Sequence, residues 1–191
     1  MYTKIAVQGI LICFMANLMF GCIKPRKAED VRCQEVTLSL DEMLFHPEHL
    51  RDTAFHPKYK YVTYVDSMEC SPCKIAHLGI WNYFRNELAN NNAALYLILA
   101  VTRDKVPEIQ EIHNQYKHRT PIYIDTLGVF ERDNPGIASM TTEYHSFLLD
   151  DNNRIVVAGD ASINHYVRDE IFRILSERTD STITIRGKMS Y

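Results

Sequence analysis

The chain has 191 residues, a net charge of −3 at neutral pH and 46% hydrophobic residues, which is enough apolar material for the core of one domain. Lysines and arginines are scattered among the acids without forming a basic stripe, and there is no P-loop or glycine-rich phosphate motif. These features exclude nucleic acid and nucleotides as expected partners.

The N-terminal segment has the pattern of an export signal. Lys4 precedes an apolar run over residues 5–20, and Gly21 and Cys22 follow it. A small residue before a cysteine at the end of such a run resembles the lipobox of bacterial lipoproteins, although the two residues before it depart from that pattern. The resemblance implies that Cys22 carries lipid. A retained membrane anchor and a conventional signal peptide cut elsewhere are the alternatives, and all three export the domain.

The chain is expected to divide into four segments: a lipoprotein-type signal peptide over 1–22, a charged tether over 23–35, one domain over 36–178 and a polar tail over 179–191. Cys33 lies in the expected tether. Because Cys13 would leave with the signal and Cys22 would be lipidated, Cys33 is the odd thiol, and we expect it to be unpaired or intermolecular. A resolving or regulatory role is the alternative.

Strands and helices are predicted to alternate through the domain. Expected strands span 61–65, 95–101, 122–124, 144–149 and 154–158, and expected helices span 37–50, 75–89, 106–116 and 164–177, with a helical turn over 129–133. The near-continuous apolar run over 95–101 is typical of a strand covered on both faces. Turn-forming residues over 150–153 predict a β-hairpin between the last two strands. Residues 182–185 of the tail are expected to form an edge strand or to be disordered.

Two cysteines three residues apart, Cys70 and Cys73, follow the first firm strand and precede a helix. This spacing allows a small disulfide ring, and the free amides of a helix N-terminus favour a thiolate at Cys70. Pro72 fits the first turn, where its missing N–H costs nothing, and Lys74 adds a positive charge. Reversible dithiol–disulfide exchange is the leading hypothesis. An inert disulfide and a zinc site are the alternatives, the latter weakened because only His77 is available nearby as a further ligand.

This order of elements, with CxxC after the first strand of the core, resembles the thioredoxin-like superfamily, and most closely its TlpA-like membrane-tethered thiol–disulfide oxidoreductases. The resemblance covers residues 59–175 and is most specific at 70–74 and in the hairpin over 147–156. It implies an α/β thioredoxin-like fold, with a central mixed β-sheet flanked by helices, a C-terminal β-hairpin and a closing helix.

The same resemblance implies roles for the two thiols. Cys70 would attack a disulfide of a protein substrate, and Cys73 would then resolve the mixed disulfide. No diffusible cofactor is implied, since the dithiol itself cycles. The implied partners are protein thiols and disulfides, together with a membrane electron donor that re-reduces the pair.

Two positions depart from the family pattern. Glu69 replaces the tryptophan common before this motif, and a carboxylate so close would raise the pKa of Cys70 and make the pair more reducing. The alternative for Glu69 is a solvated loop residue. The cis-proline usual before the hairpin strand is absent, and Tyr144 or His145 occupies that substrate-contacting place. His145 could stabilise a thiolate or join Cys70 and Cys73 as a metal ligand, and an ordinary strand residue is the alternative.

From these patterns we expect an exported, lipid-anchored oxidoreductase of the cell envelope that acts as a reductase. The competing hypothesis is a binding or assembly lipoprotein that keeps the fold without turnover. In that case Cys70 and Cys73 form a structural disulfide or part of a Cys/His metal site.

Overall fold

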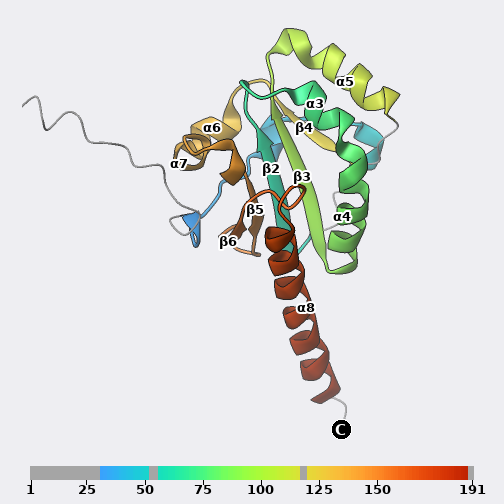
Figure 1. The fold of residues 1–191 in the computed structure, drawn as a ribbon, viewed down its shortest axis with the longest axis vertical. Helices are drawn as coiled ribbons and strands as arrows, with labels where there is room; N and C mark the ends of the chain where they lie inside the picture. The colour runs from blue at the N-terminus through green and yellow to red at the C-terminus, as the bar shows by residue number, and fades with distance from the viewer. Residues whose placement is uncertain (1–30, 52–55, 117–119, 189–191) are drawn as a thin grey trace, which may run out of the picture.

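The structure is a computed structural model that describes residues 31–51, 56–116 and 120–188 (Figure 1). Its centre is a six-stranded mixed sheet in the order β1-β4-β3-β2-β5-β6. The strands are β1 (Leu44–His46), β2 (Tyr59–Val65), β3 (Ala93–Ala100), β4 (Ile122–Asp125), β5 (Ser146–Leu149) and β6 (Ile155–Ala158). Strands β2, β3 and β4 are parallel, whereas β1, β5 and β6 each pair antiparallel with their neighbour.

Helices cover both faces of this sheet. The α-helices are α3 (Ser71–Ala76), α4 (Leu78–Asn90), α5 (Val106–Gln115), α6 (Val129–Asp133), α7 (Pro135–Ala138) and α8 (His165–Lys188). The short 3-10 helices are η1 (Leu40–Glu42), η2 (Glu48–Leu50), η3 (Arg103–Lys105) and η4 (Thr142–Tyr144). Figure 1 shows α3, α4 and α5 on one side of the sheet, α6 and α7 on the other, and α8 continuing past the end of the strands.

The alternation of side chains along β2 divides the core into two layers. Tyr61 and Val65 lie in the layer under α3, α4, α5 and α8, whereas Val62 and Tyr64 lie in the layer under α6 and α7. All four are almost completely buried. Because successive residues of a strand point to opposite faces, burial of these four residues shows that β2 is covered on both sides.

The arrangement confirms the thioredoxin-like fold. A parallel β-α-β unit (β2, α3 with α4, β3) is followed by the hairpin of β5 and β6 and the closing helix α8, and β5 pairs with β2. Strand β4 extends the sheet on the β3 side, and β1 completes that edge. Since β2 lies between β3 and β5, the CxxC motif that follows it lies at the end of a central strand.

Three expected elements are wrong in detail. Residues 37–50 form η1, β1 and η2 instead of a helix, because the edge of β4 offers a pairing partner to Leu44–His46. The expected helix over 75–89 is interrupted at His77, which ends α3 and precedes α4. The expected strand or disorder at 182–185 is instead the continuation of α8.

The expected tether is attached to the domain at its end. Val31 is buried, and the Cys33 N–H donates to the Ile155 carbonyl at 2.8 Å. Glu35 then forms a β-bridge with Arg154. Cys33 itself is a free, exposed thiol. The expected signal segment, including Cys22, lies outside the described residues, and no helix in the described part of the chain is long and apolar enough to cross a bilayer.

Candidate active site at the Cys70–Cys73 disulfide

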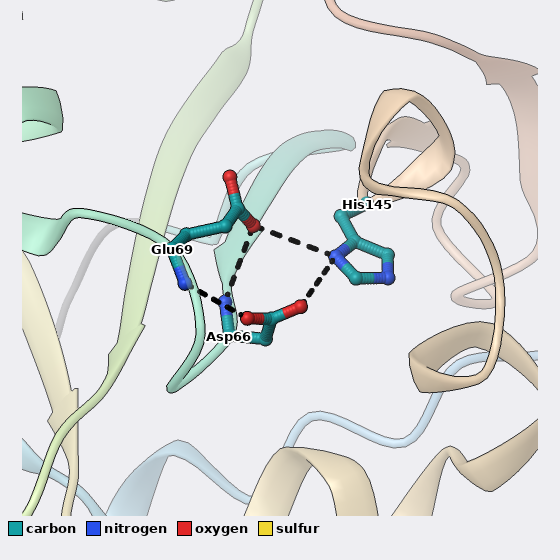
Figure 2. Close-up of side chains that lie close together, drawn as sticks. All are labelled: Asp66, Glu69 and His145. Carbon is teal, nitrogen blue, oxygen red and sulfur yellow. Dashed lines mark hydrogen bonds and ion pairs between the residues drawn. The ribbon is translucent and has the colours of Figure 1, made fainter.

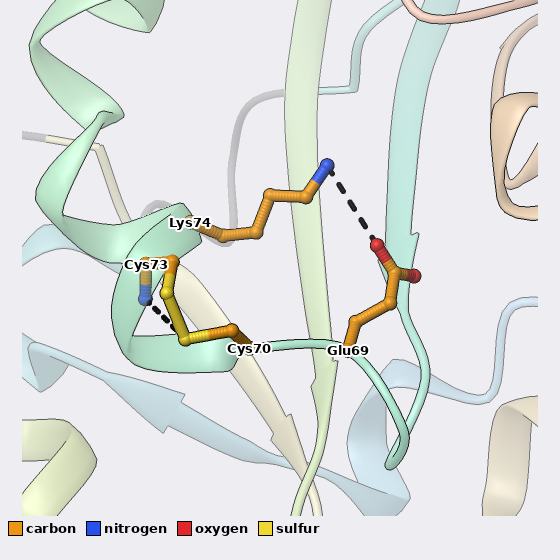
Figure 3. The surroundings of a disulfide bond; sticks show 4 residues. All are labelled: Glu69, Cys70, Cys73 and Lys74. Atoms are coloured by element: carbon orange, nitrogen blue, oxygen red, sulfur yellow. Dashed lines mark hydrogen bonds and ion pairs between the residues drawn. A yellow bond between two sulfur atoms is a disulfide. The ribbon is translucent and has the colours of Figure 1, made fainter.

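Cys70 and Cys73 form a disulfide at the start of α3 (Figure 3). Their sulfurs are 2.02 Å apart and their Cα atoms 5.2 Å apart, and both residues are exposed. Cys70 is the N-cap residue, and its sulfur accepts a hydrogen bond from the Cys73 N–H at 3.2 Å. Pro72 lies in the first helical turn, where no N–H is required. The pairing predicted from the spacing is thus present, at a place that a substrate can reach.

The interruption at His77 changes the electrostatic argument made from sequence. Helix α3 has only 6 residues, so the helix macrodipole at Cys70 is smaller than that of the single long helix predicted from sequence. In the disulfide the Cys70 sulfur is neutral and accepts the Cys73 N–H; after reduction, a contact of this kind favours a thiolate at Cys70.

The disulfide lines a cleft of about 490 Å³. Its walls are Glu69, Cys70, Cys73, Lys74, His77, Trp81, Asp160, Ser162 and Ile163. Trp81, which is buried, and Ile163, which is 81% exposed, are the large apolar residues of this lining. Such a cleft is suited to an apolar side chain of a protein substrate.

Lys74 carries the positive charge closest in sequence to the disulfide. Its Nζ lies 3.8 Å from Glu69 Oε2 and 3.8 Å from Asp160 Oδ2. Asp160 is oriented by hydrogen bonds that its Oδ1 accepts from the Ser162 N–H at 2.8 Å and hydroxyl at 2.6 Å. Sequence analysis missed Asp160, because only the fold brings the segment after β6 beside α3.

Glu69 belongs to a tight turn between β2 and α3. The Asp66 Oδ1 atom accepts hydrogen bonds from the Met68 N–H at 2.7 Å and the Glu69 N–H at 3.0 Å, which is the pattern of an Asx turn. Glu69 Oε1 in return accepts a hydrogen bond from the Asp66 N–H at 3.3 Å. The Glu69 side chain is 18% exposed, so it is held in place and is not a freely solvated loop residue.

His145 lies directly before β5 and points at this turn (Figure 2). Its side chain is 2% exposed, and its Nδ1 lies 3.6 Å from Glu69 Oε1 and 3.8 Å from Asp66 Oδ2. Its carbonyl accepts a hydrogen bond from the Tyr64 N–H at 2.8 Å, which continues the pairing of β2 and β5. Among the described residues, the metal-type cluster that contains His145 is completed by these two carboxylates and not by the cysteines.

The neighbours of His145 differ in exposure. Tyr144 is partly buried at the end of η4. The Tyr64 ring lies 5.4 Å from the His145 ring, and burial, with added repulsion from nearby carboxylates, raises the pKa of Tyr64 well above its usual value. Tyr64 is therefore neutral beside the cluster at physiological pH.

The strand order, with the CxxC disulfide directly after β2, defines a thioredoxin-like fold. No family model matches the chain, and no curated protein matches its sequence. Similar solved structures include the thioredoxin domain of a thiol-disulfide oxidoreductase from Bacteroides vulgatus, 14% identical with a TM-score of 0.44, over 60% of this chain and 80% of that one.

Two further similar structures come from other bacteria. The exposed lipoprotein thioredoxin of Streptococcus pneumoniae is 15% identical, with a TM-score of 0.45, over 64% of this chain and 87% of that one. Peroxiredoxin Q of Xanthomonas campestris is 16% identical, with a TM-score of 0.44, over 65% of this chain and 81% of that one. The fold assignment rests on the strand order and not on these similarities.

Proposed function

We propose that this protein is a thiol–disulfide oxidoreductase that exchanges disulfides with protein substrates. The observation that carries the proposal is the exposed Cys70–Cys73 disulfide, which lines an apolar-walled cleft at the end of the central strand of a thioredoxin-like fold. A disulfide that only stabilised the fold would gain nothing from exposure at a cleft, and the ring it closes between residues three apart constrains little of the unfolded chain.

In the reducing direction, the Cys70 thiolate attacks one sulfur of a substrate disulfide. The Cys70–substrate disulfide forms while the other substrate sulfur leaves as a thiolate and takes a proton from water. The Cys73 thiolate then attacks the Cys70 sulfur, which forms the Cys70–Cys73 disulfide and releases the second substrate thiol. Two electrons pass to the substrate, and the oxidised state described here is the product of that half-cycle.

The charged neighbours favour the reducing direction in this proposal. The Glu69 carboxylate disfavours a thiolate at Cys70, which makes the dithiol a stronger reductant, and Lys74 moderates that effect because it pairs with Glu69 at 3.8 Å. Pro72 shapes the first turn of α3. Substrate contacts are assigned to the segment of Tyr144 and His145. The His145 ring is buried and its carbonyl already accepts the Tyr64 N–H, so the partly exposed Tyr144 is the residue of this pair that a substrate can contact.

We further propose that the domain works outside the cytoplasm, anchored by lipid at Cys22. The support is the Lys4, apolar run and Gly21-Cys22 pattern of the N-terminus. Residues 1–22 are then a signal peptide, residues from 23 link the lipid to the domain, and residues 179–191 are a C-terminal extension. In an oxidising compartment a reductase needs a donor, for which a membrane electron-transfer protein is the natural class.

The test uses the full chain in an assay for reduction of a protein disulfide by dithiothreitol. We expect catalysis to be abolished by Cys70→Ser. After reduction and removal of dithiothreitol, Cys73→Ser should accumulate a covalent mixed disulfide with the substrate, because no second thiol resolves it. Cys33→Ser is the matched control, because Cys33 is a free and exposed thiol that the mechanism does not use. Activity that survives Cys70→Ser, or that disappears with Cys33→Ser, contradicts the proposal.

The competing function is a binding lipoprotein in which Cys70 and Cys73 form a permanently oxidised structural disulfide. It is favoured by the absence of proline directly before β5, where Tyr144 and His145 stand and the resembling family usually carries a cis-proline. This alternative expects no turnover in the assay and full retention of partner binding in a Cys70→Ser, Cys73→Ser double variant.

A further inference from the structure

We infer that Asp66, Glu69 and His145 form a binding site for a divalent transition-metal ion of the zinc class, beside the disulfide but independent of it. Two segments build the site: the turn after β2 supplies both carboxylates, and the residue before β5 supplies the imidazole (Figure 2). One ligand atom from each residue lies within 4.8 Å of the other two. The inference does not depend on the proposed redox function.

The buried imidazole is the observation that points to a ligand. His145 is the buried member of the cluster, and neither of its ring nitrogens has a hydrogen-bond partner. Buried polar atoms are nearly always satisfied, so an imidazole left without a partner inside a protein calls for one. Nδ1 faces the two carboxylates, yet its distances of 3.6 and 3.8 Å are too long for hydrogen bonds.

These distances fit ligands that share an ion. Nitrogen and oxygen ligands lie about 2.1 Å from zinc, so two ligands at tetrahedral corners are about 3.4 Å apart. The separations of Nδ1 from Glu69 Oε1 and from Asp66 Oδ2 exceed that edge by only a few tenths of an ångström. A water molecule can complete the fourth corner, and the partly exposed Asp66 side chain, at 25%, leaves the ion a way in.

In each carboxylate, the oxygen that faces away from His145 has its own partner, and this contact orients the oxygen that faces His145. Asp66 Oδ1 accepts two main-chain N–H groups, leaving Oδ2 toward His145. Glu69 Oε2 pairs with Lys74, and Oε1, which also accepts the Asp66 N–H at 3.3 Å, faces His145. Contacts of this kind, one step beyond the metal, hold ligands in place and tune affinity.

Charge and donor type select the ion. Two carboxylates and a neutral imidazole carry two negative charges, which a divalent cation neutralises. Imidazole as a ligand favours zinc and its transition-metal neighbours over magnesium and calcium, which take oxygen ligands. Zinc is also expected to bind more tightly than cobalt at such a site.

The test is titration of the oxidised full chain with Co²⁺, followed by competition with Zn²⁺. Oxidation matters because the Cys70–Cys73 disulfide cannot supply thiolate ligands. We expect one Co²⁺ per chain, with visible d–d absorption and no sulfur-to-cobalt charge-transfer band, and displacement by Zn²⁺. His145→Gln and Glu69→Gln are each expected to lower the affinity at least about tenfold, since even residues one step beyond a metal cost that much.

His77→Gln is the matched control, because His77 is an exposed histidine in the same cleft as the disulfide but outside the cluster. It should leave the Co²⁺ affinity unchanged. Unfolding of each variant in chelator reports whether it folds. If His145→Gln does not fold, Glu69→Gln carries the test, because its partly exposed side chain tolerates a neutral amide of the same shape.

Three results would overturn the inference: no saturable one-to-one binding, an affinity that both cluster variants leave unchanged, or an equal loss in His77→Gln. A fourth is a ¹⁵N spectrum in which the His145 ring is doubly protonated and does not respond to Zn²⁺. That result would show that a protonated His145 pairs directly with the Asp66 and Glu69 carboxylates and that no metal ion lies between them.

Discussion

Replacing Tyr61 by phenylalanine removes one oxygen atom from the centre of the fold. Tyr61 is fully buried, and its hydroxyl donates to the Gly159 carbonyl at 3.0 Å and accepts from the Ala161 N–H at 2.8 Å. These bonds fix the segment after β6 that carries Asp160, the ion-pair partner of Lys74. The phenylalanine variant leaves both main-chain groups without that partner.

The expected cost follows from those two groups. A buried donor or acceptor left unsatisfied costs about 1–3 kcal/mol, and the partial relief from no longer burying a hydroxyl reduces the total. We therefore expect Tyr61→Phe to lower the free energy of unfolding by about 2–4 kcal/mol at pH 8. Urea denaturation of the oxidised chain, in a Cys33→Ser background that prevents disulfide exchange, measures this. Tyr83→Phe, at a tyrosine that is 69% exposed, is the matched control with an expected effect near zero.

The same pair of variants gives a pH test. Burial raises the pKa of Tyr61 far above its usual value, whereas in the unfolded chain the pKa is about 10. The stabilising contribution of this group is complete below pH 10 and is lost as pH rises toward the folded-state pKa. At pH 11, one unit above the unfolded-state pKa, the wild type has lost on the order of 1 kcal/mol through this group, so the deficit of Tyr61→Phe should shrink by about that amount between pH 8 and pH 11. A cost below about 0.5 kcal/mol at pH 8, or a deficit that is equal at both pH values, would refute this reasoning.

Other changes test the surroundings of the site. Gly159→Ala should destabilise the fold by about 1–3 kcal/mol in urea, because Gly159 has a φ of +135° and a Cβ there would lie 2.8 Å from a Val167 methyl; an unchanged midpoint would contradict this. Asn134→Ala should cost about 1–3 kcal/mol in thermal or urea unfolding, because its amide accepts from the Thr37 N–H at 2.8 Å and donates to the Thr37 carbonyl at 2.9 Å; retention of full stability would show that water replaces both bonds. Glu69→Gln should make the dithiol more oxidising by roughly 10–30 mV in a glutathione titration with chelator present, and a shift to lower potential would show that the carboxylate does not favour the reducing direction.

Strand β3 could be predicted because burial on both faces leaves a near-continuous apolar run. Residues 95–101 correspond to β3, and residues 61–65 are the last part of β2. Periodicity could not locate the break at His77, because it occupies a single residue and α4 begins at the next one. Residues 37–50 were misassigned as a helix because the short strand β1 depends on the edge of β4, which lies far along the chain.

The disulfide could be predicted because its chemistry is local in sequence. The cluster around His145 could not, since it joins residues from two distant segments. One signal was available: β5 pairs antiparallel with β2, with Thr63 opposite Ser146, so the residue before β5 must lie near the turn that follows β2. The sequence analysis left His145 open between a role beside the cysteines and an ordinary strand position, and in the structure its ring faces Asp66 and Glu69.

The most direct test of the central proposal is a redox titration of the full chain, with thiol alkylation read by mass at each potential and a chelator present. We expect a reversible two-electron couple confined to Cys70 and Cys73, within the range of about −120 to −270 mV spanned by oxidoreductases and toward its reducing end. A pair that stays oxidised below about −300 mV, as structural disulfides do, would contradict the proposal and favour a binding lipoprotein with a structural disulfide.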